Sequence, residues 1–547
     1  DINPLVRLYY VEVQEPDMHD PSGDLRRLLN ALEADWQLLN LSYDVALLAT
    51  IQPILRVGNW GVTVAVRQGK QIVALWPGLK DRIFGVAVDV GSTTIAAHLC
   101  NLSSGEVVAS SGVMNPQIRF GEDLMSRVSY VMMNPGGEVD MTNAVREAIN
   151  GLVTDLVKQV ECEAADLLEI TFVANPIMHH LLLGINPIEL GGAPFALATD
   201  MAVNILARDM GVNLNPQARA YLLPCIAGHV GADTAGMVLA EEPYNHDEMT
   251  LLVDVGTNAE IVLGNRHRLV ACSSPTGPAF EGAQISCGQR AAAGAIERIR
   301  IDPVTLEPRF QVISCELWSD EKGFDTAIEK TGITGICGSG IIEVVAEMYL
   351  AGVITQDGVI DGSLAATNPR IQPDGRTFSY EIMPSTETRG AVKIMQNDIR
   401  AIQLAKAALY AGVKLLMQYQ QVDKVDRIRF AGAFGSHIDV KYAMVLGLIP
   451  DCALNEVSSA GNAAGTGARI ALLNEASRAE IEQVVRSIEK IETAVEPDFQ
   501  QLFIDAMAFP NKVDAFPELE KVVTLPPLKE ASAESENGDK KRRRRRG

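Results

Sequence analysis

Two apolar runs of the same kind stand out in the hydrophobic pattern of the chain. Residues 86–90 have the sequence Val-Ala-Val-Asp-Val and residues 251–255 have Leu-Leu-Val-Asp-Val, and a glycine and a hydroxyl residue follow each run. Short apolar runs of this length predict buried strands. A second strand, a turn and a third strand are then expected after each copy. The repetition predicts two related half-domains in an α/β protein.

The turns that follow these strands have the composition of a phosphate-binding loop. Gly91 and Gly256 allow the backbone to turn sharply. Successive N–H groups in such a turn form a concave site for anions. Asp89 and Asp254 repel phosphate, but they fit a Mg²⁺ ion that is held largely through water between the carboxylates and the phosphate. The pattern therefore predicts one magnesium nucleotide between the two half-domains.

Other periodic segments complete the expected organisation. An amphipathic helix over 24–34 and two strands near 62–66 and 72–75 predict a small α/β module. Longer amphipathic helices are expected from Thr142 and from Gln396. The expected segments are 1–25 (linker), 26–82 (small α/β middle domain), 83–250 (first half-domain), 251–515 (second half-domain with an insertion) and 516–547 (disordered tail with a basic end).

The net charge, the apolar stretches and the cysteine spacing of the chain exclude some classes of function. The 547 residues carry a formal charge of −22, which argues against a nucleic-acid partner. No apolar stretch has transmembrane length and the start of the chain lacks signal-peptide character, so we expect no membrane contact and a cytoplasmic protein. The eight cysteines are scattered without a Cys-x-x-Cys pair, which fits a reducing compartment. The basic run at 540–546 is expected to contact acidic partners.

Several polar residues leave two interpretations open. His179 and His180 follow the strand expected at 170–174, and they are either metal ligands or hydrogen-bonded residues at a helix start. Asp233 either orients water or caps a helix. Lys406 either reaches the nucleotide or is an ordinary lysine on a helix surface. The sequence alone does not separate these alternatives.

The two Asp-Val-Gly loops, together with the turn at 432–435, resemble the acetate and sugar kinase/Hsp70/actin superfamily. The resemblance implies two duplicated ribonuclease-H-like half-domains around a nucleotide cleft. It makes 89–94 and 254–258 the two phosphate loops and 432–435 the adenosine loop, with connecting helices that start at 175–180 and 335–340. The residues thus expected to bind the nucleotide are Gly91, Ser92, Thr93, Thr94, Gly256, Thr257, Asn258, Gly432, Ala433, Phe434 and Gly435.

Four longer strings, at 115–117, 254–260, 403–407 and 461–467, are similar to the reductive activators of corrinoid proteins, and the match extends from about residue 5 to about residue 515. This resemblance implies an ATPase that couples ATP binding and hydrolysis to reduction of Co(II) to Co(I) in a corrinoid protein of a methyltransferase system. An electron donor and a homodimer are also expected. Asp89 and Asp254 would hold Mg²⁺ through water, and Glu260 and Asp233 are the candidates for orienting water.

The family carries a [2Fe–2S] cluster on four cysteines of an N-terminal domain, and this chain has no counterpart of those ligands. Its first cysteine is Cys100, and the family's linker region would begin at Asp1. Either the cluster domain was removed from this chain or this member works without it. Electron delivery by the chain itself is therefore not expected.

Three other functions use the same superfamily fold. A small-molecule kinase would need a substrate pocket, for which Gln117, Asp123 and Arg127 are the candidates. An activator of 2-hydroxyacyl-CoA dehydratases would need paired cysteines that bind a [4Fe–4S] cluster between two subunits. Three cysteines of this chain are available for that role. These cysteines are Cys272, Cys287 and Cys337. A non-enzymatic nucleotide switch of the actin or chaperone kind is the third alternative.

Overall fold

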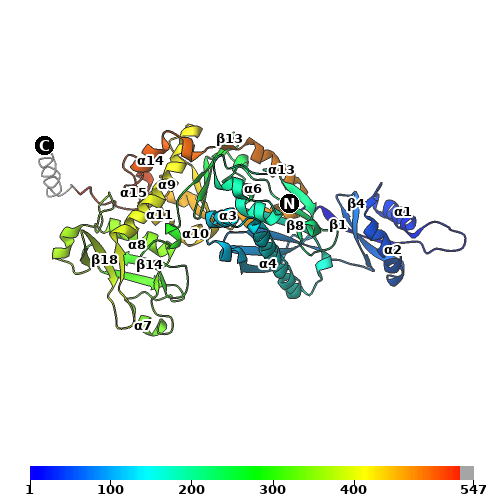
Figure 1. Ribbon diagram of the computed structural model, residues 1–547, viewed down its shortest axis with the longest axis horizontal. Helices are drawn as coiled ribbons and strands as arrows, with labels where there is room; N and C mark the ends of the chain where they lie inside the picture. Colours follow the sequence, from blue (N-terminus) through cyan, green and yellow to red (C-terminus); the bar gives the residue numbers. More distant parts are fainter. Residues whose placement is uncertain (530–547) are drawn as a thin grey trace. The chain divides into compact units, whose positions relative to one another are not determined.

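The computed structural model describes residues 1–529, and the basic run at 540–546 lies outside the described residues. The chain divides into two compact units, and Figure 1 shows its helices and strands coloured along the sequence. Unit 1 consists of Asp1–His246, Arg266–Leu269 and Asn462–Lys490, and unit 2 consists of Asp247–Asn265, Val270–Gly461 and the chain from Ile491 onward. No helix within residues 1–529 is both long and apolar enough to cross a membrane.

Unit 1 begins with a small α/β module around a four-stranded sheet of order β1-β3-β4-β2. Its elements are β1 (Val6–Glu12), α1 (Asp24–Trp36), β2 (Ser42–Tyr43), α2 (Val45–Val57), β3 (Gly61–Arg67) and β4 (Gln71–Pro77). Strand β1 pairs with β3 along its whole length, so part of the segment expected as a linker belongs to this sheet. Sequence periodicity missed α2, which has Pro53 in its interior and starts at the cap Asp44.

The first half-domain is built on a six-stranded sheet of order β7-β6-β5-β8-β10-β9. Its strands are β5 (Phe84–Val90), β6 (Thr94–Asn101), β7 (Val107–Met114), β8 (Leu167–Ala174), β9 (Val203–Leu206) and β10 (Arg219–Leu222). Between them lie α3 (Leu124–Met133), α4 (Gly137–Val160) and α5 (Pro176–Leu183), and α6 (Ala232–Glu241) follows β10. Strand β5 runs antiparallel to β6 and parallel to β8.

The second half-domain repeats this order. Its sheet has the order β21-β20-β11-β12-β13-β22, in which the first three strands in sequence form a meander and two later strands join beside β11. These strands are β11 (Thr250–Val255), β12 (Ala259–Asn265), β13 (Arg268–Ser274), β20 (Arg427–Ala431), β21 (Val457–Gly461) and β22 (Glu489–Lys490). The predicted duplication of ribonuclease-H-like halves is confirmed.

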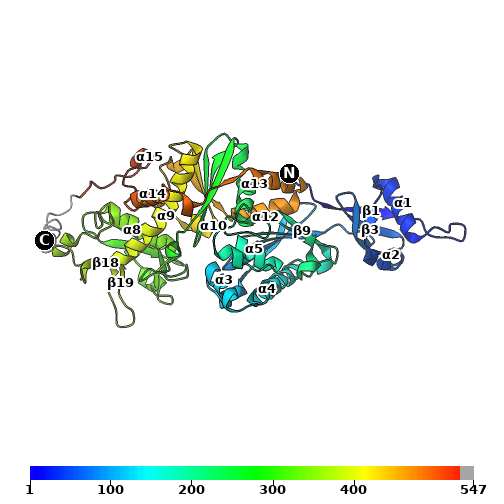
Figure 2. The same cartoon turned by 45° about the horizontal axis from the view of Figure 1, so that its top comes forward.

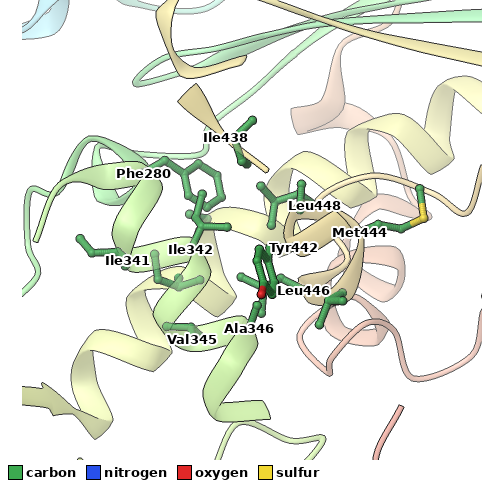
Figure 3. Packing of buried hydrophobic residues seen from close by; sticks show 14 of the residues in the cluster. Phe280, Ile341, Ile342, Val345, Ala346, Ile438, Tyr442, Met444, Leu446 and Leu448 are labelled. Atoms are coloured by element: carbon green, nitrogen blue, oxygen red, sulfur yellow. The ribbon is translucent and has the colours of Figure 1, made fainter. Parts of the chain in front are cut away.

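Helices and an insertion surround the second sheet. The helices are α8 (Gly338–Leu350), α9 (Gln396–Gln420), α10 (Gly432–His437), α11 (Val440–Leu446) and α14 (Phe499–Asp505). The insertion contains α7 (Phe324–Ala327) and two three-stranded sheets, formed by β14 (Ala295–Ile301), β15 (Pro308–Val312) and β16 (Gly335–Ile336), and by β17 (Ile371–Asp374), β18 (Thr377–Met383) and β19 (Val392–Met395). Tyr442 of α11 packs among the buried side chains of α8, including Ile342 and Ala346 (Figure 3).

Two boundaries differ from the expected ones. Residues 462–490, expected in the second half-domain, belong to unit 1 and contain α12 (Ala463–Leu473) and α13 (Glu475–Ser487). A disordered tail was expected from residue 516, but α15 (Pro517–Glu520) lies in this segment and its Leu519 is fully buried. The carboxylate of Asp451 accepts hydrogen bonds from the N–H groups of Glu518 and Leu519, which fixes the start of α15.

Helix α12 joins unit 1 because it packs on α6 and on the strands β5 and β8. Glycine allows this close approach: a Cβ atom on Gly467 would lie 2.1 Å from the backbone oxygen of Gly236. The resemblance placed the connecting helices at α5 and α8. That assignment stays a prediction, and the boundaries between the two units fall at 246–247, 265–266, 269–270, 461–462 and 490–491.

The two faces of the first sheet have different coverings. Helix α4 packs on one face and α12 on the other (Figure 2). Val86 and Val88 of β5 belong to the same buried cluster as the apolar side of α4, whereas Gly85 faces Leu472 of α12. Because side chains alternate along a strand, Asp89 points to the same face as Gly85. The carboxylate therefore lies on the side covered by α12.

Candidate functional site

The first loop joins β5 to β6 in a turn that requires glycine. The N–H group of Gly91 donates to the backbone oxygen of Thr94 at 3.0 Å. A Cβ atom at position 91 would lie 2.5 Å from that oxygen. The N–H groups of Ser92 and Thr93 have no hydrogen-bond acceptor within residues 1–529, and both residues reach the surface. The turn thus presents unsatisfied backbone donors, as an anion site requires.

Protein donors hold the carbonyl groups of this loop. The Asn115 side chain donates to the backbone oxygen of Gly91 at 2.9 Å, and the Asn115 N–H group donates to that of Thr93 at 2.7 Å. The fully buried guanidinium of Arg127 donates to the backbone oxygen of Ser92 at 2.6 Å. With the carbonyl oxygens already bound inside the protein, the N–H groups are the part of the loop left for a ligand.

The second loop, between β11 and β12, has the same arrangement with different residues. The Gly256 N–H group donates to the backbone oxygen of Asn258 at 3.0 Å. The Thr276 hydroxyl lies 3.1 Å from the backbone oxygens of both Gly256 and Thr257, and the Gly277 N–H group donates to Thr257 at 2.7 Å. Thr257 and Asn258 are exposed, and their N–H groups have no acceptor in the described part of the chain.

Sequence reasoning missed the function of Asn115 and Thr276, although a signal was present. Each polar residue comes just after the third strand of its half-domain, Asn115 after β7 and Thr276 after β13. In both copies, the strand order brings this position next to the loop between the first two strands. A polar residue at the same place in both repeats is the pattern that could have identified these contacts.

Two carboxylates and an amide meet in unit 1. Burial and the nearby carboxylate of Asp233 raise the pKa of Asp89 to about 7, and the Asn462 side chain opposes this by hydrogen bonding to Asp89. Burial raises the pKa of Asp233 to about 6. Two carboxylates in such surroundings hold their protons to a higher pH than ordinary aspartates unless a cation neutralises them. The pair therefore suits a divalent ion, whose binding would displace protons.

The position of Asp233 excludes one of its two interpretations, that of a helix cap. Gly231, not Asp233, is the N-cap of α6, and Asp233 lies in the first turn, where its carboxylate accepts from the N–H group of Thr234. Asn462 is the N-cap of α12. The starts of these two helices thus bring Asp233 and Asn462 to Asp89, which leaves orientation of water as the surviving prediction for Asp233.

Asp254 has its own surroundings in unit 2. It lies opposite Glu260 across the β11–β12 hairpin, and it neighbours Ala431 of β20. Gly432 follows with a φ of 82°, and a Cβ atom there would lie 2.8 Å from Oδ1 of Asp254. The turn predicted to bind adenosine therefore starts directly beside the carboxylate, and only glycine fits at its first position.

The rest of this turn is shaped by packing. The Phe434 ring lies 5.5 Å from that of Phe280 and 6.3 Å from that of Phe430, measured between ring centroids. Gly435 is buried, and a Cβ atom there would lie 2.4 Å from the Cβ atom of Phe430. Ala433 is exposed. The contact of residues 432–435 with adenosine stays a prediction.

Lys406 is not available to a nucleotide, and it is not a surface lysine. It is fully buried in α9, and its ammonium donates to the backbone oxygens of Ala508 and Pro510, the latter at 2.9 Å. Burial lowers the pKa of Lys406 well below its ordinary value. The lysine fixes the segment after α14 against α9, and this contact between distant segments was invisible in the helical pattern.

The candidates for a kinase substrate pocket are used within the fold. Arg127 and Gln117 are fully buried, and the Gln117 side chain donates to the backbone oxygen of Met141 at 2.9 Å. Asp123 caps α3 by accepting from the N–H group of Ser126. Arg127 thus supports the first loop, and Gln117 and Asp123 make contacts to α4 and α3, so nothing here favours the kinase alternative.

The histidine pair is a hydrogen-bonded part of α5. The Nδ1 atoms of His179 and His180 lie 3.0 Å apart, and Nε2 of His180 accepts from the Ala198 N–H group. Burial lowers the pKa of both histidines to about 4, so they are neutral at pH 7. No group of three or more His, Cys, Asp or Glu residues within 1–529 could hold a metal ion.

The cysteines do not form a cluster site. All eight are free, and those considered for a [4Fe–4S] cluster lie against separate backbone oxygens: Cys272 against Gly412, Cys287 against Ala391 and Cys337 against Ile296. The described residues therefore do not fit an iron–sulfur cluster. The nucleotide loops, in contrast, have the free N–H groups and carboxylates that fit Mg·ATP.

Comparison with known proteins decides the family. Models described as the RACo linker region, the RACo middle region and the C-terminal ASKHA domain of RACo match residues 1–82, 84–246 and 248–520. The chain is 31% identical to the corrinoid activation enzyme RamQ of Eubacterium limosum over 440 residues, which cover 79% of this chain and 71% of RamQ. The chain belongs to the family of reductive activators of corrinoid proteins. The predicted resemblance is confirmed.

Two further similarities support membership in this activator family. A Methanosarcina barkeri protein named [Co(II) methylated amine-specific corrinoid protein] reductase is 22% identical over 468 residues, covering 82% of this chain and 81% of that protein. A solved structure of a reductive activator for corrinoid, iron-sulfur protein is 32% identical, with a TM-score of 0.78, and the match covers 93% of this chain and 80% of that chain.

Proposed function

We propose that this chain is an ATP-dependent reductive activator that couples ATP binding and hydrolysis to the reduction of Co(II) to Co(I) in a corrinoid protein. Its similarity to RamQ and to the corrinoid protein reductase supports the substrate class. The observation that carries the proposal is the pair of matching loops, each with unsatisfied N–H groups next to an aspartate, in a member of this family.

In this proposal both loops bind the same Mg·ATP. Asp89 and Asp254 hold the magnesium ion through water, and the N–H groups of residues 91–94 and 256–258 bind the phosphate oxygens. Residues 432–435 contact the adenosine. Positioning and charge neutralisation of this kind supply most of the catalysis of phosphoryl transfer.

Water attacks the γ-phosphate and the products are ADP and phosphate. Asp233 and Glu260 are the residues that we assign to orienting the attacking water. The raised pKa of Asp233 suits a carboxylate that exchanges a proton near neutral pH. Glu260 lies opposite Asp254 on the same hairpin.

The redox step transfers one electron to Co(II) from a separate donor. The reaction is unfavourable with ordinary biological donors, and ATP contributes by binding more tightly to one conformer of the activator–corrinoid complex than to another. We propose that the electron donor is a separate protein or domain. We also propose that the chain acts as a homodimer, which light scattering of the purified protein would test.

The direct test is anaerobic. The chain is mixed with candidate Co(II) corrinoid proteins and a one-electron chemical reductant, and the Co(I) absorbance is followed with and without ATP. We expect Co(I) to accumulate only with ATP, and Asp254→Asn to abolish the effect. Asp374→Asn, which changes an exposed aspartate of β17, is the matched control and should behave as the wild type. No ATP-dependent Co(I) with any candidate partner would refute the function.

A double-mutant cycle tests whether one ion is shared. Mg·ATP affinity is measured for Asp89→Asn, for Asp254→Asn and for the double variant. If both carboxylates act on the same magnesium ion, the losses should be non-additive by about 0.5–3 kcal/mol. Simple additivity would contradict the shared site while leaving each loop as a separate anion site.

A further inference from the structure

A polar pocket in unit 1 is independent of the nucleotide loops. It has a volume of about 290 Å³ and lies where the turn between β3 and β4 meets strands β9 and β10 of the first six-stranded sheet. Arg67, Lys70 and Arg219 supply three cations to its wall, and no carboxylate lines it. The amides of Gln71 and Asn204 add further polar groups.

Arg67 is the buried part of this pocket. Its side chain is only 5% exposed, one of its terminal nitrogens forms an ion pair with Glu169, and Nη2 has no hydrogen-bond partner within residues 1–529. Glu169 also pairs with Arg478, whose Nη2 lies 3.2 Å from Oε2 of Glu169. One carboxylate therefore pairs with two buried guanidinium groups.

The other two cations, Arg219 and Lys70, add positive charge to the pocket. Arg219 is held in place by Asn204, which accepts from its Nε at 2.8 Å and from its Nη2 at 3.2 Å. Neither Arg219 nor Lys70 has an acidic partner within 4.0 Å in the described part of the chain. The carboxylate of Glu475 lies nearby, where it accepts a hydrogen bond from Gln68 at 2.6 Å and partly offsets the charge around Arg67. Burial, together with the charges of Arg478 and Arg219, lowers the pKa of Arg67 to about 9, and Glu475 opposes this shift.

We propose that this pocket binds a small multivalent oxyanion, such as the phosphate group or the clustered carboxylates of a metabolite. Guanidinium groups present paired N–H donors that match the oxygens of phosphate and carboxylate, and lysine adds a mobile charge. Nη2 of Arg67 gains the acceptor that it lacks. The anion would bridge the small α/β module and the first half-domain, because Lys70 comes from one and Arg219 from the other.

Inorganic phosphate and citrate are the two probes, and sodium chloride at equal ionic strength is the reference. Binding to the full chain is measured by titration calorimetry and by the shift in thermal unfolding. We expect one or both probes to bind and to stabilise the protein beyond chloride, and the tighter probe identifies the class of ligand. Equal effects of all three salts would show screening alone and would overturn the proposal.

Variants separate this pocket from the nucleotide loops, which can also bind phosphate. Arg219→Gln and Lys70→Gln change side chains at the protein surface and should each weaken binding about tenfold. Lys158→Gln, on the exposed side of α4, should bind as the wild type does. Gly91→Ala should leave oxyanion binding to this pocket intact. The pocket should also bind the oxyanion if the chain proves to have no ATPase activity. Loss of all oxyanion binding in Gly91→Ala, with full binding in Arg219→Gln, would overturn the assignment.

Discussion

Replacing Asp233 with asparagine should change how the stability of the protein depends on pH. In the folded chain the pKa of Asp89 is raised to about 7 and that of Asp233 to about 6, whereas an unfolded aspartate has a pKa near 3.8. Because both folded pKa values are raised, the folded state keeps protons that the unfolded state releases. The two groups therefore cost nothing below about pH 4, and stability falls as the pH rises toward 6 and 7.

The magnitude follows from the number of protons. Each proton retained only by the folded state changes the free energy of unfolding by about 1.4 kcal/mol per pH unit. Between about pH 4.5 and 5.5 both carboxylates contribute, so together they lower stability by about 2.7 kcal/mol over that unit. Asp233→Asn removes one titrating group, and about half of this contribution should disappear.

The assay is denaturant unfolding of the nucleotide-free protein at several pH values. The slope of unfolding free energy against pH is compared between the wild type and Asp233→Asn, so that the contributions of all other carboxylates cancel. Asp155→Asn removes an equal charge from the exposed side of α4 and should leave the slope unchanged. Equal slopes for wild type and Asp233→Asn would refute the argument that burial holds protons on this pair, with repulsion by Asp233 adding to the effect on Asp89.

Three other substitutions test the loops and the buried lysine. Gly91→Ala forces a Cβ atom against the backbone and should lower Mg·ATP affinity about tenfold or more, whereas Gly151→Ala, where that atom meets nothing within 4 Å, should leave the affinity unchanged. Arg127→Gln removes the donor to Ser92 and should reduce both nucleotide affinity and stability, the latter by about 3 kcal/mol in denaturant unfolding. Lys406→Met should cost about 1–3 kcal/mol of stability with normal ATP turnover per folded molecule, and lost turnover at unchanged stability would contradict its structural role.

Local pattern was sufficient for the loops and for the duplication. Each loop consists of a buried strand with an aspartate near its end, followed by a glycine at which the backbone turns. These features lie within a few consecutive positions, so Asp89, Gly91, Asp254 and Gly256 could be predicted from the sequence. The three-stranded meander at the start of each half was predicted in the same way, and the structure confirms it.

Tertiary structure alone decided what surrounds these loops. Arg127 supports the first loop and Lys406 is buried under the segment after α14, although both looked like candidates for ligand contact. Asn462 reaches Asp89 across more than 370 positions because α12 returns to unit 1 and packs on α6. Periodicity reports which face of an element is apolar, but not which distant element covers it. The partner of a buried polar group is set by that long-range packing, and therefore only the folded chain shows it.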